Sequence, residues 1–262
     1  MRIIDLIPEY EATYLSCLKD WDETMVRLGD HKICWYQRMK SRGLRVKLAV
    51  DDAEKVAGMM QYVPIESSRA SGRALYFVQC LWVHGYSKGM GNMHGRGIGK
   101  ALLRAAEEDV IELGAKGIAA WGMEDQASWF RGQGFIDADS IGVSFLLWKA
   151  FSDDAEAPRW IKPRKTPEAI PDKVIVTMFI NGWCTDTYEV VEFVRQAVAG
   201  CDDRVIFKEI DTSDARTLQE WGIENALFID SDCIWSYTDY PPPTPEEIRN
   251  KIEQKLGDRR DE

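Results

Sequence analysis

The chain has 262 residues, which is enough for two domains that each bury their own core. Its formal net charge of −10 argues against a nucleic-acid partner, because binding to a phosphate backbone requires a basic face. No apolar run approaches the roughly 20 residues that span a bilayer, and charges near the N-terminus argue against a signal peptide. With six widely spaced cysteines, these features predict a reduced, cytoplasmic protein that does not bind membranes.

Residues 1–150 combine helical and strand-like hydrophobic patterns, which predicts a first domain of the α/β (α+β) class. The patterns indicate helices at 9–22 and 32–42, strands at 45–50 and 56–63, and a loop at 67–72. The run Leu75–Val83 is almost continuously apolar, as in a strand that is covered on both faces. We therefore expect this strand at the centre of the sheet.

Three alternating glycines follow this strand and lead into an amphipathic helix. Because Gly95, Gly97 and Gly99 have no Cβ, the backbone there can approach a ligand closely. The unpaired N–H groups of the first helical turn point outward at the positive end of the helix dipole. Arg96 and Lys100 add positive charge. The segment predicts a site for a pyrophosphate group.

The remaining elements of the first domain follow from periodicity. A helix is expected from Ile98 to a stop at Gly114. Its apolar stripe comprises Ile98, Leu102, Ala106, Val110 and Leu113. We expect a strand at 117–121, a short helix at 126–132 and a closing strand at 143–149. Residues 151–172 contain four prolines and no apolar period, which predicts an extended linker between the domains.

Three segments of the first domain, in this order, resemble the GCN5-related N-acetyltransferase (GNAT) family: Leu81-Trp82-Val83, the glycine segment 94–99, and the aromatic-rich segment 129–135 that ends in Gly-Phe. The resemblance implies a mixed central sheet with flanking helices, and acetyl-CoA as cosubstrate. It implies main-chain contacts of Leu81, Trp82 and Val83 with the pantetheine arm. It also implies pyrophosphate contacts by His94, Gly95, Arg96, Gly97, Ile98, Gly99 and Lys100.

The sequence offers several candidates for the catalytic groups. Acyl transfer to an amine requires removal of a proton from the amine and protonation of the leaving thiolate. The resemblance places Phe130 where many family members have an acidic tyrosine, so that group is missing. The nearby candidates are His84, Glu124, Tyr86 and Cys80. Of these, His84 directly follows the central strand and belongs to the residue type best suited to a base, while the favoured alternative is a structural loop residue.

Two features depart from the family pattern. His94 stands where the family has Arg or Gln, and the loop at 84–93 is longer than usual. This loop could fold over the substrate sites or be a mobile insertion. The grouping Cys80, His84 and His94 fits no standard zinc spacing, so we predict no metal site.

Residues 173–262 predict a second, smaller α/β domain with the order β-α-β-α-β-β-α. Its expected elements are strands at 173–180 and 204–210, helices at 185–199 and 214–221, a hairpin at 227–237 and a helix at 245–256. With Trp183-Cys184-Thr185 at the first turn, this order resembles the thioredoxin fold without its first strand and helix. A GNAT domain with such a tail resembles the YoaP-type acetyltransferases.

Cys184 is the candidate reactive residue of the second domain. A cysteine at a helix N-terminus has its thiolate stabilised by the helix dipole. Thr187 occupies the position of the resolving cysteine, so a dithiol mechanism within the domain is not available. Cys184 therefore indicates either monothiol chemistry or a noncatalytic recognition or structural role.

The sequence predicts a direct-transfer N-acetyltransferase that uses acetyl-CoA and acts on a small-molecule amine. The alternative is a thiol-dependent redox or thiol-binding protein that uses Cys184 and binds CoA only as a structural or sensing ligand.

Overall fold

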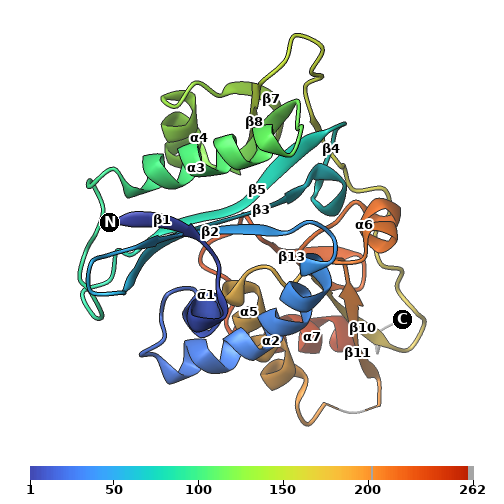
Figure 1. Cartoon of the computed structure of the whole chain (residues 1–262). Coiled ribbons are helices and arrows are strands. Elements are labelled where there is room, and N and C mark those ends of the chain that lie inside the picture. The colour runs from blue at the N-terminus through green and yellow to red at the C-terminus, as the bar shows by residue number, and fades with distance from the viewer. Residues whose placement is uncertain (202, 259–262) are drawn as a thin grey trace. The chain divides into compact units, whose positions relative to one another are not determined.

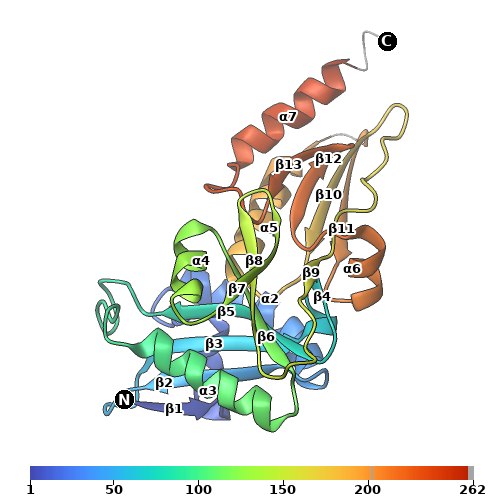
Figure 2. The same ribbon diagram turned by 90° about the horizontal axis from the view of Figure 1, so that it is seen from above.

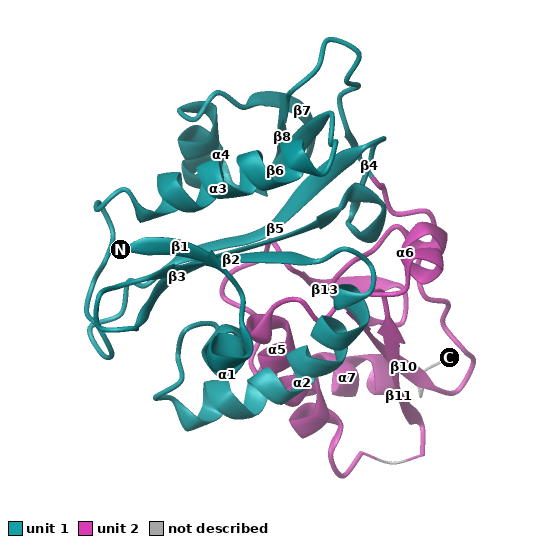
Figure 3. Ribbon diagram, in the orientation of Figure 1, with its two compact units in different colours: residues 1–160 teal, residues 161–262 magenta. Residues whose placement is uncertain are grey.

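A computed structural model describes residues 1–201 and 203–258, which fall into two compact units (Figures 1 and 3). Unit 1 comprises Met1–Trp160 and unit 2 begins at Ile161. Each unit has its own sheet and its own hydrophobic core. Within the described residues, no helix combines the length and the apolar character needed to cross a bilayer.

Unit 1 is built on a seven-stranded mixed sheet with the order β1-β2-β3-β5-β6-β8-β7. The strands are β1 (Arg2–Asp5), β2 (Arg45–Val50), β3 (Val56–Pro64), β5 (Leu75–Val83), β6 (Gly117–Gly122), β7 (Ile136–Ile141) and β8 (Ser144–Ala150). Only the pair β5–β6 is parallel. The prediction that β5 is central is confirmed, because it is the fourth of the seven strands. The sequence did not predict β1 or β7.

Helices cover both faces of this sheet (Figure 1). On one side lie α1 (Glu11–Leu15) and α2 (Glu23–Lys40), and on the other α3 (Ile98–Glu112) and α4 (Glu124–Arg131). The predicted stripe of α3 is buried from Ile98 to Val110, as expected for core residues. Leu113, also assigned to the stripe, is 52% exposed because it lies just past the end of the helix.

The N-terminal helices differ from the prediction. The expected helix at 9–22 is replaced by a 3₁₀ helix, η1 (Pro8–Tyr10), and the five-residue α1, after which Cys17 and Leu18 have positive φ and end the helix. Helix α2 begins nine residues earlier than predicted, at Glu23 instead of Lys32. The Asp22 carboxylate caps it by accepting hydrogen bonds from the N–H groups of Thr24 and Met25.

Residues 151–172, predicted as an extended linker, are packed against other parts of the chain. The strand β9 (Arg159–Trp160) pairs with β4 (Ala70–Ser71), which lies in the expected loop at 67–72. Farther along, the Arg164 N–H donates to the carbonyl of Trp221, and a Cβ on Gly222 would lie 2.0 Å from the Lys162 oxygen. The first part of this segment therefore belongs to unit 1 and the later part to unit 2.

Unit 2 contains a four-stranded sheet with the order β11-β10-β12-β13, in which only β10 and β11 are parallel. Its elements are β10 (Val174–Ile180), α5 (Thr185–Val198), β11 (Val205–Asp211), α6 (Ala215–Trp221), β12 (Ala226–Ile229), β13 (Asp232–Ser236) and α7 (Pro245–Asp258). Helices α5 and α7 share the larger core cluster, whereas Trp221 of α6 packs in a second cluster (Figure 2). The predicted element order is confirmed.

A charged network anchors α3 to the sheet of unit 1. The Asp109 carboxylate accepts hydrogen bonds from Arg45 Nε at 2.9 Å, from the Tyr62 hydroxyl at 2.8 Å and from Lys47 Nζ at 3.2 Å. Burial raises the pKa of Asp109, but the hydrogen bonds from Arg45 and Tyr62 and the Lys47 charge outweigh it and lower that pKa overall. Burial and the hydrogen bond to Asp109 raise the pKa of Tyr62, which remains a neutral donor.

We expect Asp109→Asn to lower the free energy of unfolding by about 2 kcal/mol, because it leaves two cations without their shared carboxylate. Because the pKa of Asp109 is lower in the folded than in the unfolded state, its contribution is present above the unfolded value of about 3.9 and is lost as the pH falls through the folded value. Denaturant unfolding at neutral and acid pH measures both effects. Glu112→Gln, one turn on in α3, is the control. Equal stability of the two variants at neutral pH would contradict the prediction.

Candidate functional site

Strands β5 and β6 diverge and open a wedge in the sheet of unit 1. Their ladder joins only Leu75–Phe77 with Gly117–Ala119, although both strands continue beyond it. The register of β5 against β3 shifts between Val78 and Cys80, so Gln79 is an extra residue in β5. Such a β-bulge bends a strand and increases its twist, which separates it from one neighbour. The predicted contact residues Leu81, Trp82 and Val83 all lie in the diverging part of β5.

Backbone polar groups of β5 face this wedge. The His84 N–H donates to the Ala57 carbonyl on the β3 side, and because backbone groups alternate along a strand, the Val83 carbonyl points away from β3. The Gln79 carbonyl is taken by the Trp121 indole N–H, which reaches across from β6 at 3.1 Å. By the same alternation, the main-chain groups of Leu81 and the Val83 N–H face the wedge, whereas the Val83 carbonyl accepts a hydrogen bond from His94.

The glycine segment lies at the N-terminus of α3, as predicted. Gly95 and Gly97 have φ values of +74° and +76°, which favour glycine, and an added Cβ at either would meet no atom within 4 Å. The first intrahelical bond runs from the Ala101 N–H to the Gly97 carbonyl, so the preceding N–H groups lie outside the helical ladder. Ile98 is buried and can offer a ligand only its backbone, whereas Arg96 and Lys100 are exposed.

His94 connects the glycine segment to the end of β5. Its Nε2 lies 2.9 Å from the Val83 carbonyl oxygen, which can only accept, so Nε2 is the donor. The loop packs closely here, because a Cβ on Gly85 would lie 2.8 Å from the His94 ring. The side chain predicted to contact a pyrophosphate thus holds the strand end in this structure.

His84 is held in one tautomer. Its side chain is 1% exposed, and Nδ1 lies 2.8 Å from the Gly91 carbonyl oxygen. Because that oxygen only accepts, Nδ1 carries the proton and Nε2 of the neutral ring carries a lone pair. Nε2 is buried and has no hydrogen-bond partner among the residues that the structure describes. Nε2 is therefore the ring nitrogen that can accept a proton, and the loop at Gly89 covers it.

Aromatic rings and a glycine enclose His84. The ring of Trp21 lies 5.1 Å from the imidazole and that of Tyr86 5.3 Å, measured between centroids. Gly89, with φ +73°, packs so closely that a Cβ there would lie 2.6 Å from Trp21 Cζ3 and 2.9 Å from His84 Nε2. The long loop after β5 is thus packed against the candidate base at this point.

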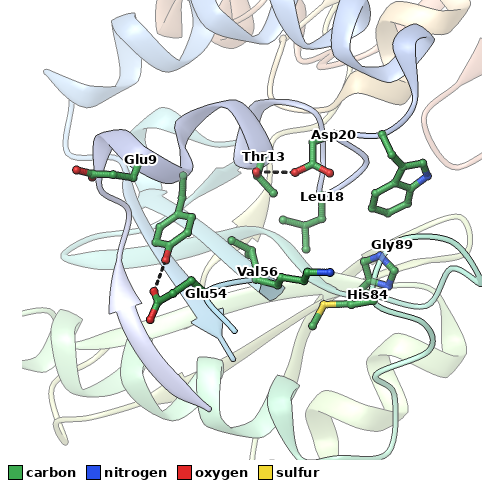
Figure 4. Close-up of a pocket in the computed structure, with 12 residues that line it drawn as sticks. Glu9, Thr13, Leu18, Asp20, Glu54, Val56, His84 and Gly89 are labelled. Carbon is green, nitrogen blue, oxygen red and sulfur yellow. Dashed lines mark hydrogen bonds between the residues drawn. The ribbon is translucent and has the colours of Figure 1, made fainter. Parts of the chain in front are cut away.

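A pocket of about 350 Å³ opens beside His84 (Figure 4). Its walls come from the N-terminal helices, the turn between β2 and β3, and the loop after β5. The lining residues are Glu9, Tyr10, Thr13, Leu18, Asp20, Trp21, Glu54, Lys55, Val56, His84, Gly89 and Met90. The volume is in the range of small-molecule sites.

The other predicted catalytic candidates lie in different surroundings. Tyr86 belongs to the aromatic cluster at His84, with Lys19 Nζ 4.8 Å from its ring centroid. Glu124 begins α4, is 70% exposed, does not line the pocket and pairs with Arg131 at 3.0 Å. Phe130 is buried in the core. Among the described residues, no three His, Cys, Asp or Glu side chains gather as a possible metal site.

Cys184, the alternative thiol candidate, lies in unit 2. It is the N-cap residue of α5, as predicted, but its side chain is largely buried, with 8% exposure. The Tyr237 hydroxyl donates a hydrogen bond to its sulfur at 3.5 Å, and the ring of Tyr237 packs on Trp183 with centroids 5.0 Å apart.

Sequence reasoning did not find the residues that form the pocket with His84. Trp21 and Asp20 precede α2, Glu54 lies in a turn, and Gly89 lies in the long loop. These segments are far apart along the chain and share no motif. Glycine readily adopts positive φ, so the sequence could mark Gly89 as a turn position. It could not show that Gly89 lies next to His84.

We expect Gly89→Ala to destabilise the protein by about 1–3 kcal/mol more than Gly91→Ala. Both glycines lie in the same loop with positive φ, but a Cβ on Gly91 would meet no atom within 4 Å. The difference between the two variants therefore isolates the packing of Gly89 on Trp21 and His84. Denaturant unfolding curves measure it, and indistinguishable curves would show that the loop does not pack on His84 in solution.

The comparisons with known proteins concern unit 1. The profile of the family described as "Acetyltransferase (GNAT) family" matches residues 5–135, half of the chain. A GNAT-family acetyltransferase of Desulfovibrio desulfuricans is 12% identical, with a TM-score of 0.45, over 58% of this chain and 99% of its own. A ribosomal-protein-alanine N-acetyltransferase of Brucella melitensis is 20% identical, with a TM-score of 0.43, over 58% and 100%. A comparison with curated proteins found no match.

A further solved structure is that of a GNAT-family acetyltransferase from Brucella melitensis in complex with acetyl-CoA. It is 17% identical to this chain, with a TM-score of 0.42, and the similarity covers 59% of this chain and 90% of its own. The segment matched by the family profile contains β5, the glycine segment and the pocket.

Proposed function

Because the chain belongs to the acetyltransferase (GNAT) family, we propose that it transfers the acetyl group of acetyl-CoA directly to the amine of a small molecule. The observation that carries this proposal is the wedge between β5 and β6, which lies in the same unit as the glycine segment at the start of α3 and the pocket beside His84.

We also propose a cytoplasmic location, which is supported by the lack of a disulfide among the six cysteines, all within the described residues.

Acetyl-CoA would bind along the open side of β5. The main chain of Leu81–Val83 would pair with the amides of the pantetheine arm, as an added strand does at a sheet edge. The backbone N–H groups from Gly95 to Lys100 would hold the pyrophosphate, because the N-terminus of α3 places partial positive charge there. Arg96 and Lys100 would add ionic attraction, and His94 would keep the glycine segment against the end of β5.

His84 would remove the proton from the acceptor amine. Its Nε2 accepts the proton as the amine nitrogen bonds to the acetyl carbon, and the carbon–sulfur bond then breaks. The departing thiolate takes up a proton, for which we propose the hydroxyl of Tyr86 as the source because its ring lies next to that of His84. Glu124 is exposed and paired with Arg131. It would therefore act as a proton donor or acceptor only through a water or a bound substrate that connects it to the reacting atoms.

The cofactor site is tested by calorimetric titration of acetyl-CoA into the full chain and into Gly97→Glu. We expect saturable binding to the unmodified chain and at least tenfold weaker binding to the variant, because its carboxylate occupies and repels the pyrophosphate site. Gly114→Glu is the matched control, since it lies at the other end of α3 with φ +80° and nothing within 4 Å. No binding to the folded, unmodified chain would refute the acetyltransferase proposal.

The role of His84 is tested with His84→Asn, in which the amide can still donate to the Gly91 carbonyl but nothing replaces Nε2. We expect kcat/KM for an amine to fall about 10²- to 10⁴-fold, with the affinity for acetyl-CoA unchanged. His31→Asn, outside the pocket, is the control. A rate within threefold of the unmodified enzyme would exclude His84 as the base.

For unit 2, we propose a thioredoxin-like, YoaP-type domain. The proposal is supported by the element order from β10 to α7 and by Cys184 at the N-cap of α5. The thiol-dependent function is the alternative for the whole protein. In the titration and kinetic experiments, Cys184→Ser separates the two functions, because acetyl transfer by unit 1 does not require this thiol.

A further inference from the structure

We propose that the side-chain amide of Gln79 donates a hydrogen bond to the acetyl carbonyl oxygen of bound acetyl-CoA and stabilises the negative charge that forms on this oxygen during transfer. The contact rests on the proposed function and adds one residue to the site that carries it out. Two observations support it: Gln79 lies at the branch of the wedge, and the protein leaves its amide nitrogen without a partner.

Gln79 lies where β5 and β6 separate. The last pair in the ladder of these strands is Phe77 with Ala119, two residues before Gln79. The Trp121 indole N–H of β6 donates to the Gln79 carbonyl at 3.1 Å, which ties the bulge to β6 at this point. Bulges beside ligand sites change the direction of a side chain. The extra residue of β5 is therefore the side chain that the bulge places at the branch.

The side chain of Gln79 lies on the sheet face that α1 and α2 cover. Its neighbour Val78 packs in the core cluster with residues of α3, on the other face. Because successive side chains of a strand alternate, Gln79 projects toward α1 and α2. Cys80 lies on this face too, because it pairs with Gln61, whose side chain accepts a hydrogen bond from the Tyr14 hydroxyl of α1. Two successive residues on one face are what a bulge produces.

The amide nitrogen of Gln79 lacks a partner. The residue is 1% exposed, and its Nε2 is buried with no hydrogen-bond partner in the part of the chain that the structure describes. Gln61 on the next strand is buried as well, but its Oε1 accepts from Tyr14 at 2.8 Å. A buried donor without an acceptor destabilises a protein. Its presence at the branch of the wedge indicates a ligand that brings an acceptor oxygen.

The length of the pantetheine arm brings the thioester to this position. The proposed pyrophosphate site begins at His94, whose side chain is bonded to the Val83 carbonyl at the end of β5. From the pyrophosphate to the sulfur, the arm is about as long as four residues of extended chain. Counted back from Val83, four residues lead to Gln79, about 13 Å along the strand. The thioester carbonyl would therefore supply the oxygen that Nε2 lacks.

The contact acts on the step in which the carbonyl carbon becomes tetrahedral. As the amine nitrogen bonds to this carbon, one electron pair of the C=O double bond moves to the oxygen, and an N–H donor stabilises the charge there. The pair returns when the C–S bond breaks and the thiolate leaves with the electrons of that bond. Overall, one proton passes from the amine to the sulfur. Gln79 exchanges no proton, so the contact holds whichever group takes the proton from the amine.

Infrared difference spectroscopy tests the contact with acetyl-CoA that carries ¹³C at the acetyl carbonyl. In the full chain, we expect the labelled carbonyl band at lower wavenumber than in free acetyl-CoA, because the hydrogen bond weakens the C=O bond. Gln79→Met, which is similar in length but has no donor, should lack this shift. Its affinity for acetyl-CoA should fall about 2- to 10-fold, while the affinity for CoA, which has no acetyl carbonyl, is unchanged. With an amine that the enzyme acetylates, kcat should fall about 10²- to 10³-fold.

Stability distinguishes this role from a structural one. Because Nε2 has no partner in the free protein, Gln79→Met should unfold at the same or a higher denaturant concentration than the unmodified chain. Thr177→Val in β10 of unit 2 is the matched control, because Thr177 is 2% exposed and its hydroxyl also lacks a partner among the described residues. This control should leave the carbonyl band and the affinity for acetyl-CoA unchanged.

Gln79→Asn is the second variant, in case the methionine variant does not fold. It keeps the amide but withdraws it by one methylene group, so the shift of the carbonyl band should be lost here as well. A band that stays shifted in both variants would overturn the assignment to Gln79.

The outcomes separate this contact from the proposed function. Absence of acetyl-CoA binding to the unmodified chain refutes both. If acetyl-CoA binds but its carbonyl band is the same in the unmodified chain and in Gln79→Met, the contact is wrong and acetyl transfer stands. A lower unfolding midpoint with equal losses of affinity for CoA and acetyl-CoA would assign Gln79 a structural role and likewise overturn the contact.

Discussion

The arrangement of unit 1 depends on how β5 ends. The bulge at Gln79 separates β5 from β6, so one edge of a central strand is left open in a sheet that is otherwise paired. An open edge is normally a liability, because unpaired backbone groups attract other strands. Here the edge is short and lies between covered faces, which suits it to an extended ligand. The residues at its end, Val83 and His84, then connect the wedge to the pocket.

The long loop after β5 is fixed by hydrogen bonds at its two ends. The Met93 N–H donates to the His84 carbonyl at 2.8 Å, His84 Nδ1 donates to the Gly91 carbonyl, and His94 donates to the Val83 carbonyl. The loop therefore does two things at once. It fixes the tautomer of His84, and it holds the glycine segment next to the end of β5.

Each of the two units buries its own hydrophobic core. Unit 1 buries residues of α3 under its mixed sheet, and the Asp109 network fastens that helix to β2 and β3. Unit 2 has its own sheet, with α5 and α7 in one core cluster. The proline-containing segment that follows residue 160 is held against unit 2 by contacts with Trp221 and Gly222. The sites proposed for acetyl-CoA and for the acceptor both lie in unit 1, and Cys184 is the candidate reactive residue of unit 2.

The sequence by itself determined the central strand, the glycine segment, the amphipathic helix and the element order of unit 2, because hydrophobic period and glycine conformation are local properties. It also marked His84 as a candidate base. Only the tertiary structure decided the tautomer of His84, the contact of His94 with Val83, the pairing of β4 with β9, and the acidic pocket. Each of these joins segments without a shared motif. Two-residue strands show no periodicity, and a carboxylate in a turn looks the same in sequence whether it faces solvent or a ligand.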